Sequence, residues 1–249
     1  MSKRFEELDW RETPIGEVSL RRRLEPTLKI EVYEVMLGDE YLMSSLFTVA
    51  EVALSDLGLA AAPDDALDVV VGGLGLGYTA RAALADPRVR SLAVVEALDA
   101  VIDWHRQGLL PHAEDLTDDP RCRLVHGDFF ALVAGAERFW PGGPDRHHAV
   151  LLDVDHSPRH LLNDSHAPFY TPAGLGRVAD RLHPGGVFAL WSDDPPDEDF
   201  TDVLQQVFAT VTTHVVPFAN HLTGGTSANT VYVAVAPGER IARRSGYPR

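Results

Sequence analysis

The sequence predicts an α/β protein in which a mostly parallel sheet, closed by an antiparallel last strand, follows a small N-terminal β-unit. From residue 66 onward, short apolar runs alternate with helical stretches, and a glycine-rich loop follows the first of these runs. Before residue 45, polar and apolar residues alternate instead. Because strands that alternate with helices are joined by right-handed crossovers, the pattern after residue 66 is typical of a parallel sheet.

The N-terminal residues show the period of half-buried strands. Polar and apolar side chains alternate over residues 17–20 and 30–37. Gly38 and Asp39 then offer a turn before residues 40–43. We therefore expect a small antiparallel β-unit in this part of the chain.

A helix is predicted over residues 45–60, ending near Gly58, and it separates the two patterns. We expect residues 1–60 to form the N-terminal hairpin-and-helix unit. Residues 61–249 are expected to form the α/β domain.

Five apolar runs predict the strands of the main sheet. Residues 67–71 form a continuous β-branched run, as expected for a strand that is covered on both faces. Comparable runs cover residues 92–95, 122–125, 149–152 and 187–191. Helices are predicted near 79–85, 98–108, 129–136, 172–182 and 198–208. The last apolar segments, 211–218 and 230–236, suit a closing hairpin.

The composition is that of a globular protein with an acidic surface. Hydrophobic residues make up 45% of the 249 and charged residues 24%, which excludes disorder as the main state. The net charge of −15 repels phosphate backbones and anionic lipid, so we expect no nucleic-acid or membrane partner. Basic residues cluster near the two ends and leave room for a local anionic contact: Arg21, Arg22 and Arg23, and Arg240, Arg243, Arg244 and Arg249.

The cysteine content and the apolar runs indicate the compartment. Cys122 is the single cysteine, so no intramolecular disulfide can form, and we expect it to be a small core residue. No apolar run approaches the ~18 residues of a membrane span, and the N-terminus lacks a signal-peptide core. We expect a cytoplasmic protein.

The glycine-rich loop is the sharpest local feature. Residues 69–80 read Val-Val-Val-Gly-Gly-Leu-Gly-Leu-Gly-Tyr-Thr-Ala, with glycine at Gly73, Gly75 and Gly77. Glycine permits positive φ and lets a ligand approach bare backbone at the crevice beyond the strand. The loop lacks the Gly-Lys-Ser/Thr of a P-loop and the third glycine of the dinucleotide pattern at its proper offset. A tight turn without a ligand is the plainer interpretation.

Carboxylates follow the ends of the next three predicted strands. Glu96 ends the second strand, Asp128 follows the third, and Asp153 and Asp155 follow the fourth. A carboxylate at the end of the second strand can accept two hydrogen bonds from ribose hydroxyls. One such acid is usually a helix N-cap, but an ordered set at neighbouring strand ends indicates a ligand site.

This array resembles the class I S-adenosylmethionine-dependent transferase fold, and within it the spermidine synthase (polyamine aminopropyltransferase) branch. The N-terminal β-unit is similar to that branch's hairpin module. Phe169, Tyr170 and Ala173, followed by Pro184-Gly185-Gly186, resemble its last helix and the turn into strand five. The resemblance covers roughly residues 30–235 and implies a seven-stranded Rossmann-like sheet.

The resemblance also implies a cofactor, S-adenosylmethionine or its decarboxylated form. The three loop glycines would pass under its methionine part, and Glu96 would hold the ribose. Asp128 would lie near the adenine amino group and Asp153 beside the reacting sulfonium. Carboxylates near a sulfonium and an α-amino group would favour binding. Proteins of this fold commonly form homodimers.

Three departures separate the sequence from the synthases. In an alignment on Thr79, Leu76 stands where they have an aspartate associated with the amine end of the decarboxylated cofactor. Residues 153–158 only approximate the family's Asp-Ser-Ser-Asp-Pro, whose second aspartate takes a proton from the attacking amine, and His156 stands at that offset. The family's Tyr-His-Glu stretch after the hairpin has no counterpart in residues 43–46.

The departures favour methyl transfer over aminopropyl transfer. Methyl transfer mainly requires alignment of nucleophile, methyl and sulfur, together with removal of a proton. Asp155 or His156 could remove the proton near Asp153. We expect an enzyme that methylates a small, cationic acceptor such as an amine. Spermidine synthase-type aminopropyl transfer and a non-catalytic cofactor-binding homologue are the alternatives.

Histidines are dense enough to raise the question of a metal site. His156 and His160 are four residues apart, but Pro158 between them argues against a helix that presents both on one face. No Glu-x-x-His helical pattern supports a metal either. We expect loop histidines and no metal.

Acids and aromatic residues near the fifth strand have two interpretations each. Asp193 and Asp194 could bind a cationic substrate, while Asp197 or a neighbour could simply cap the next helix. Tyr170 and Trp191 could line a substrate pocket or pack in the core.

Overall fold

The structure is a computed structural model that describes residues 5–63, 66–135 and 137–238. The basic cluster that the sequence places at the C-terminal end (Arg240, Arg243, Arg244 and Arg249) lies outside the described residues. No helix among the described residues is both long and apolar enough to cross a membrane.

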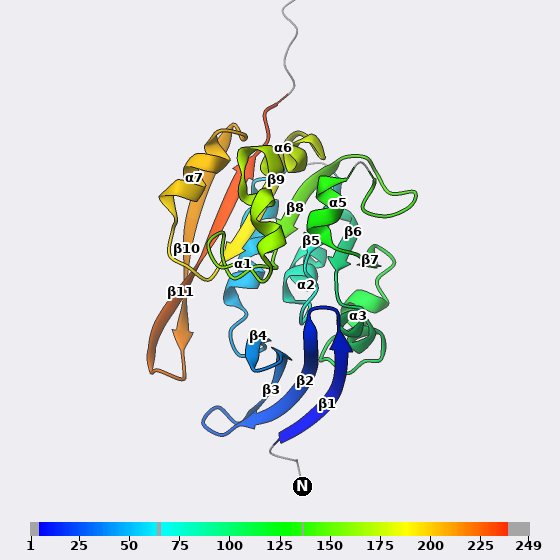
Figure 1. Ribbon diagram of the computed structural model, residues 1–249, viewed down its shortest axis with the longest axis vertical. Coiled ribbons are helices and arrows are strands. Elements are labelled where there is room, and N and C mark those ends of the chain that lie inside the picture. Colours follow the sequence, from blue (N-terminus) through cyan, green and yellow to red (C-terminus); the bar gives the residue numbers. More distant parts are fainter. Residues whose placement is uncertain (1–4, 64–65, 136, 239–249) are drawn as a thin grey trace, which may run out of the picture.

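Seven strands form one sheet in the order β10-β11-β9-β8-β5-β6-β7 (Figure 1). β5 pairs in parallel with β6 and β8, whereas β11 lies antiparallel between β9 and β10. The predicted α/β sheet with an antiparallel last strand is therefore confirmed. The strands are β5 (Leu67–Gly72), β6 (Val89–Glu96), β7 (Cys122–His126), β8 (His147–Leu152), β9 (Leu182–Ser192), β10 (Thr210–Asn220) and β11 (Gly225–Val235).

Helices cover both faces of this sheet. On one face lie α1 (Val49–Ala60), α2 (Tyr78–Ala85), α3 (Asp99–Arg106) and α4 (Glu114–Thr117). On the other lie α5 (Phe129–Ala134), the 3₁₀ helix η1 (Asp164–Tyr170), α6 (Pro172–Asp180) and α7 (Glu198–Gln205). In β5, Val69 and Val71 belong to the hydrophobic cluster on the first face and Val70 to that on the second. This alternation explains the continuous apolar runs, because both faces are buried.

The N-terminal residues form a separate four-stranded antiparallel sheet, which confirms the predicted β-unit. Its strands are β1 (Phe5–Thr13), β2 (Gly16–Glu25), β3 (Ile30–Leu37) and β4 (Glu40–Ser44), in that order. Figure 1 shows this small sheet at one end of the molecule, with β1 beside α3. Arg11 pairs with Asp103 at 2.9 Å, and the indole of Trp104 donates to Asp9 at 2.7 Å. These contacts fix the small sheet against α3.

α1 packs on the large sheet rather than on the small one. It contacts β8, β9 and β11, and a Cβ on Gly58 would come within 2.7 Å of Leu151. We therefore propose to place the boundary between the two units after β4 rather than after residue 60.

Some elements differ from the sequence-based expectation. β10 and β11 extend beyond the predicted apolar segments 211–218 and 230–236 and leave only residues 221–224 between them. The Pro-Gly-Gly turn is a bulge inside β9, where Gly185 has φ +76° and the pairing with β8 shifts register. β1, α4 and η1 were not predicted.

Candidate functional site

Two adjoining cavities lie where the carboxyl ends of the parallel strands meet the small sheet. The β6-side cavity, of about 210 Å³, is lined by residues that include Glu96 and Asp128. The β9-side cavity, of about 360 Å³, is lined by residues that include Glu51, Trp191 and Asp193. The two share a common wall made of Leu42, Met43, Gly75, Asp153, Val154 and His156.

The glycine loop needs its glycines for close packing. Gly73, Gly75 and Gly77 have φ values of +93°, +49° and +88°. A Cβ on Gly73 would collide with the main-chain oxygen of Asp153, and one on Gly75 would lie 2.5 Å from the Met43 sulfur. All three glycines line the cavities, but the space above Gly75 is filled by Met43 rather than left open.

Glu96 fastens the glycine loop to the end of β6. One carboxylate oxygen accepts from the Leu74 N–H at 3.0 Å, and the other accepts from the Leu98 N–H at 2.8 Å. The side chain lines the β6-side cavity, and burial raises the pKa of its carboxyl. Each carboxylate oxygen can accept a further hydrogen bond, so Glu96 remains able to hold a ligand hydroxyl.

Asp153 lies in the common wall, and it interacts with the carboxyl of Glu51, a residue of the β9-side cavity that the sequence analysis missed. The Thr79 hydroxyl donates to Asp153 at 2.6 Å. Burial raises the pKa of Asp153, and burial together with the charge of Asp153 raises the pKa of Glu51. Two partly buried carboxyl groups whose charges interact resist double ionisation, so the pair retains a proton above the ordinary carboxyl range.

Glu51 comes from the first turn of α1 and opens into the β9-side cavity. The resemblance had set residues 43–46 against the family's Tyr-His-Glu stretch. The structure instead brings a glutamate to the cavity several residues later. An acidic residue at the start of a helix after the β-unit was the available signal.

The structure does not bring Asp155 into either cavity. Its side chain is 1% exposed and accepts hydrogen bonds from Leu162 N–H, His166 Nδ1 and the Tyr170 hydroxyl, at 2.7–2.8 Å. These donors occupy both carboxylate oxygens of Asp155, which lies on the buried side of the loop. Asp155 is therefore not placed to take a proton from a ligand in either cavity. Tyr170 is likewise buried and lines neither cavity.

His156 and Asp128 do reach the cavities. His156 lies in the common wall, and its Nε2 is 3.3 Å from Glu40 Oε1. Asp128 lines the β6-side cavity and also caps α5, since its Oδ1 accepts from the Phe130 and Ala131 N–H groups. The N-cap interpretation of Asp128 is therefore confirmed, and the same side chain also lines the cavity.

The acids after β9 divide between two places. Asp193 lines the β9-side cavity beside Trp191 and accepts from Asn229 at 2.7 Å. Asp197 caps α7 by accepting from the Asp199 and Phe200 N–H groups, as the capping interpretation predicts.

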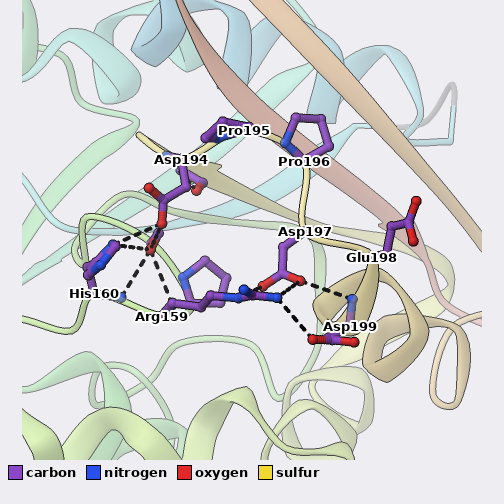
Figure 2. Close-up of a pocket in the computed structure, with 11 residues that line it drawn as sticks. Arg159, His160, Asp194, Pro195, Pro196, Asp197, Glu198 and Asp199 are labelled. Atoms are coloured by element: carbon purple, nitrogen blue, oxygen red, sulfur yellow. Dashed lines mark hydrogen bonds and ion pairs between the residues drawn. The ribbon is translucent and has the colours of Figure 1, made fainter.

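A further cavity, of about 530 Å³, lies beyond Asp194 on the far side of the same loop (Figure 2). Figure 2 shows that Arg159 pairs with Asp197 and Asp199 and that His160 pairs with Asp194, whereas Glu198 points away from them. Arg159 binds Asp197 at 2.5 Å and Asp199 at 3.0 Å, and Asp194 accepts from Ser157 and His160 at 2.6 and 2.9 Å. In the part of the chain that the structure describes, no group of three or more His, Cys, Asp or Glu side chains is placed to hold a metal ion.

Comparison with known proteins identifies relatives that match more than half of the chain. It is 31% identical over 160 residues to polyamine aminopropyltransferase 2 of Pseudomonas aeruginosa, covering 60% of this chain and 42% of that protein. It is 29% identical over 131 residues to putrescine N-methyltransferase 2 of Nicotiana tabacum, covering 53% and 33%. The chain covers less than half the length of each of these relatives. No protein-family model matches.

Solved structures share the fold over nearly the whole chain. The crystal structure of spermidine synthase from Thermotoga maritima superposes with a TM-score of 0.70 at 17% identity, covering 94% of this chain and 74% of the other. A spermidine synthase in complex with the transition-state analogue AdoDATO gives the same TM-score and identity, with coverage of 94% and 75%. The chain therefore has the spermidine synthase-like form of the Rossmann-like α/β fold and is homologous to polyamine aminopropyltransferases and putrescine N-methyltransferases.

Proposed function

We propose that this protein is a transferase that uses S-adenosylmethionine to methylate a small amine. The observation that carries the proposal is the pair of adjoining cavities that meet at Asp153 and His156. A donor in one cavity and an acceptor in the other would place their reacting atoms at the common wall. The names of the two relatives describe similar reactions, namely aminopropyl transfer in polyamine metabolism and N-methylation of putrescine.

The β6-side cavity fits an adenosyl cofactor. Glu96 supplies carboxylate oxygens for ribose hydroxyls, and Asp128 supplies a further acceptor in the lining of the same cavity. Val95, Leu98 and Val101 line the same cavity and give an apolar surface suited to a purine ring. Gly73 and Gly75 border the same cavity and would lie beside the methionine part of the cofactor.

The β9-side cavity fits a cationic acceptor. Glu51, Asp153 and Asp193 bring carboxyl groups to its wall, and Trp191 and Phe218 add aromatic surface. Carboxylates together with aromatic faces are the groups that bind ammonium ions. The net charge of −15 draws a cation toward the protein as well.

The residues at the common wall provide the proton chemistry that amine methylation needs. The bound cofactor would supply a carbon made electrophilic by its sulfonium. An attacking amine must be neutral, so a nearby group must accept its proton. His156 and Asp153 are the titratable groups of the common wall, and we assign proton removal to them in place of Asp155.

Leu76 favours methyl over aminopropyl transfer. It lines the β9-side cavity, where the synthases that the sequence resembles have an aspartate. An isobutyl group there removes a charge-assisted contact to the amine end of a decarboxylated cofactor, typically about 1.5–3 kcal/mol.

The test is to incubate the protein with putrescine and either S-adenosylmethionine or decarboxylated S-adenosylmethionine, and to identify the products by mass spectrometry. We expect methylated putrescine from the first donor and little product from the second. Spermidine from the second donor, with no methylated amine from the first, would overturn the choice of methyl transfer. Binding of the cofactor without turnover of putrescine or of a panel of other amines would favour the non-catalytic homologue.

A further inference from the structure

A buried cluster beside the β6-side cavity has no role in the chemistry described above. Asp155 Oδ1 lies 2.8 Å from His166 Nδ1, and Asp155 Oδ2 accepts from the Tyr170 hydroxyl at 2.7 Å. Asp155 and Tyr170 are buried, whereas the His166 side chain is 13% exposed and lines the cavity. The cluster therefore supports a single imidazole at the cavity wall.

The contacts of Asp155 determine which nitrogen of His166 holds the proton. Asp155 is surrounded by donors, namely Leu162 N–H, the Tyr170 hydroxyl and His166. An ionised carboxylate can only accept hydrogen bonds, so His166 Nδ1 must hold the proton in the neutral ring. Nε2 is then an acceptor, and no residue that the structure describes donates to it.

His166 lies at the same end of the cavity as Asp128. Its ring stacks on Phe130, with centroids 3.8 Å apart and an interplanar angle of 21°. Phe130 belongs to α5, whose first turn is capped by Asp128, and all three residues line the β6-side cavity. Two acceptors, a carboxylate and an imidazole nitrogen, thus border the same cavity on either side of Phe130 in the chain of contacts.

We propose that His166 Nε2 accepts a hydrogen bond from the 6-amino group of the cofactor's purine, and that Asp155 is the positioning residue that fixes this tautomer. The inference rests on the proposed function, since it presumes an adenosyl ligand in the β6-side cavity. A 6-amino group has two N–H donors, which match the two acceptors. Hypoxanthine has an oxygen at that position, which would face both acceptors without a hydrogen bond.

The experiment compares S-adenosylhomocysteine with its inosine analogue, S-inosylhomocysteine, by calorimetric titration at pH 8. We expect the protein to bind the adenine compound at least about tenfold more tightly. His166→Phe keeps a ring against Phe130 but removes the acceptor, so the preference should fall by about tenfold. Asp155→Asn can donate to Nδ1 and so move the proton to Nε2, which should reduce the preference while the stack remains.

Two controls separate this idea from a structural role and from failure of the proposed function. His160→Phe changes a histidine of the cavity in Figure 2, outside the β6-side cavity, and should leave the preference unchanged. Nitrogen-15 NMR of the imidazoles reports the His166 tautomer directly and should show it change in Asp155→Asn.

An unchanged adenine preference in folded His166→Phe, with thermal melting as the folding check, would overturn the assignment of His166. A Nε2 that bears the proton in the unsubstituted protein would overturn it as well. Failure of the unsubstituted protein to bind either compound would instead overturn the proposed function, and this inference with it.

Discussion

Met43 and Gly75 lie next to each other in the common wall of the two cavities, and each restricts which residue can occupy the other position. A Cβ at Gly75 would lie 2.5 Å from the Met43 sulfur, and the backbone there has φ +49°. A methionine from the small sheet therefore closes the wall only because the loop has no side chain at this position.

Gly75→Ala should destabilise the protein by about 1–2 kcal/mol from the left-handed backbone and further from the collision with Met43. In Gly75→Ala with Met43→Ala, the collision disappears and only the backbone cost remains. Urea denaturation of both single variants and the double variant gives the coupling energy, which we expect to be at least about 1 kcal/mol. Strict additivity would show that the two residues do not contact.

Glu96 has the most specific role predicted from the sequence, that of holding the cofactor's ribose. Glu96→Gln keeps the size of the side chain but replaces one carboxylate oxygen by an NH₂ group. This group can accept neither the main-chain N–H that the oxygen bound nor a ribose hydroxyl. Calorimetric titration should show S-adenosylhomocysteine binding weakened by about tenfold or more. Unchanged affinity in the folded variant would exclude Glu96 from the ligand site.

Residue roles were predictable where spacing after a strand determines position. Glu96 and Asp153 follow strand ends, and both reach the cavities. The direction of the Asp155 side chain could not be predicted in this way, because a loop has no fixed periodicity. The side chain turns inward to Tyr170. Glu51 was missed because an acidic residue in the first turn of a helix is common, and its position near Asp153 depends on how α1 packs on the sheet.

At the scale of elements, β8 begins with a buried histidine whose ring nitrogens lack hydrogen-bond partners among the described residues. His147 is 1% exposed, and burial lowers its pKa to about 4. The unfolded chain therefore takes up a proton that the folded protein resists. Stability should fall as the pH drops from the ordinary value of 6.5 toward 4.

His147→Phe should remove this pH dependence and raise the free energy of unfolding by about 1–3 kcal/mol, because a buried unpaired polar group is lost. Denaturation curves at pH 5 and pH 8 for both proteins measure the effect. Parallel changes with pH in the two proteins would contradict the burial of a neutral imidazole.

α1 contributes a pH dependence of the opposite sign. The raised pKa of Glu51 means that the folded state keeps its proton longer than the unfolded state does. Stability is therefore fully present below 4.5 and lost as the pH rises to about 8. Glu51→Gln should flatten this slope and gain at least about 1 kcal/mol at pH 8, as measured by thermal and urea denaturation.

Elements were predictable where burial imposes a pattern. The runs in β5, β6 and β8 are buried on both faces, so their apolar residues are continuous. β1 escaped prediction because its residues, Phe5–Thr13, are mostly polar and none of them is fully buried. α4 and η1 are too short to show a helical period, and β10 and β11 extend as a ribbon whose outer part is largely exposed.

At the scale of the whole molecule, the small sheet completes the candidate site. Ile15, Val35, Leu42 and Met43 reach the β6-side cavity from it, while the large sheet supplies the glycine loop and the carboxylates. The sequence predicted both units but not their contact. The homodimer implied by the resemblance remains a prediction, which sedimentation equilibrium can test.

The central claim is that the β6-side cavity binds an adenosyl cofactor that retains its carboxyl group. Calorimetric titration with S-adenosylmethionine, S-adenosylhomocysteine and decarboxylated S-adenosylmethionine tests it most directly. We predict saturable binding of the first two and weaker binding of the decarboxylated form, because Leu76 offers its amine end no carboxylate. Absence of binding by all three, or tighter binding of the decarboxylated form, would contradict the account.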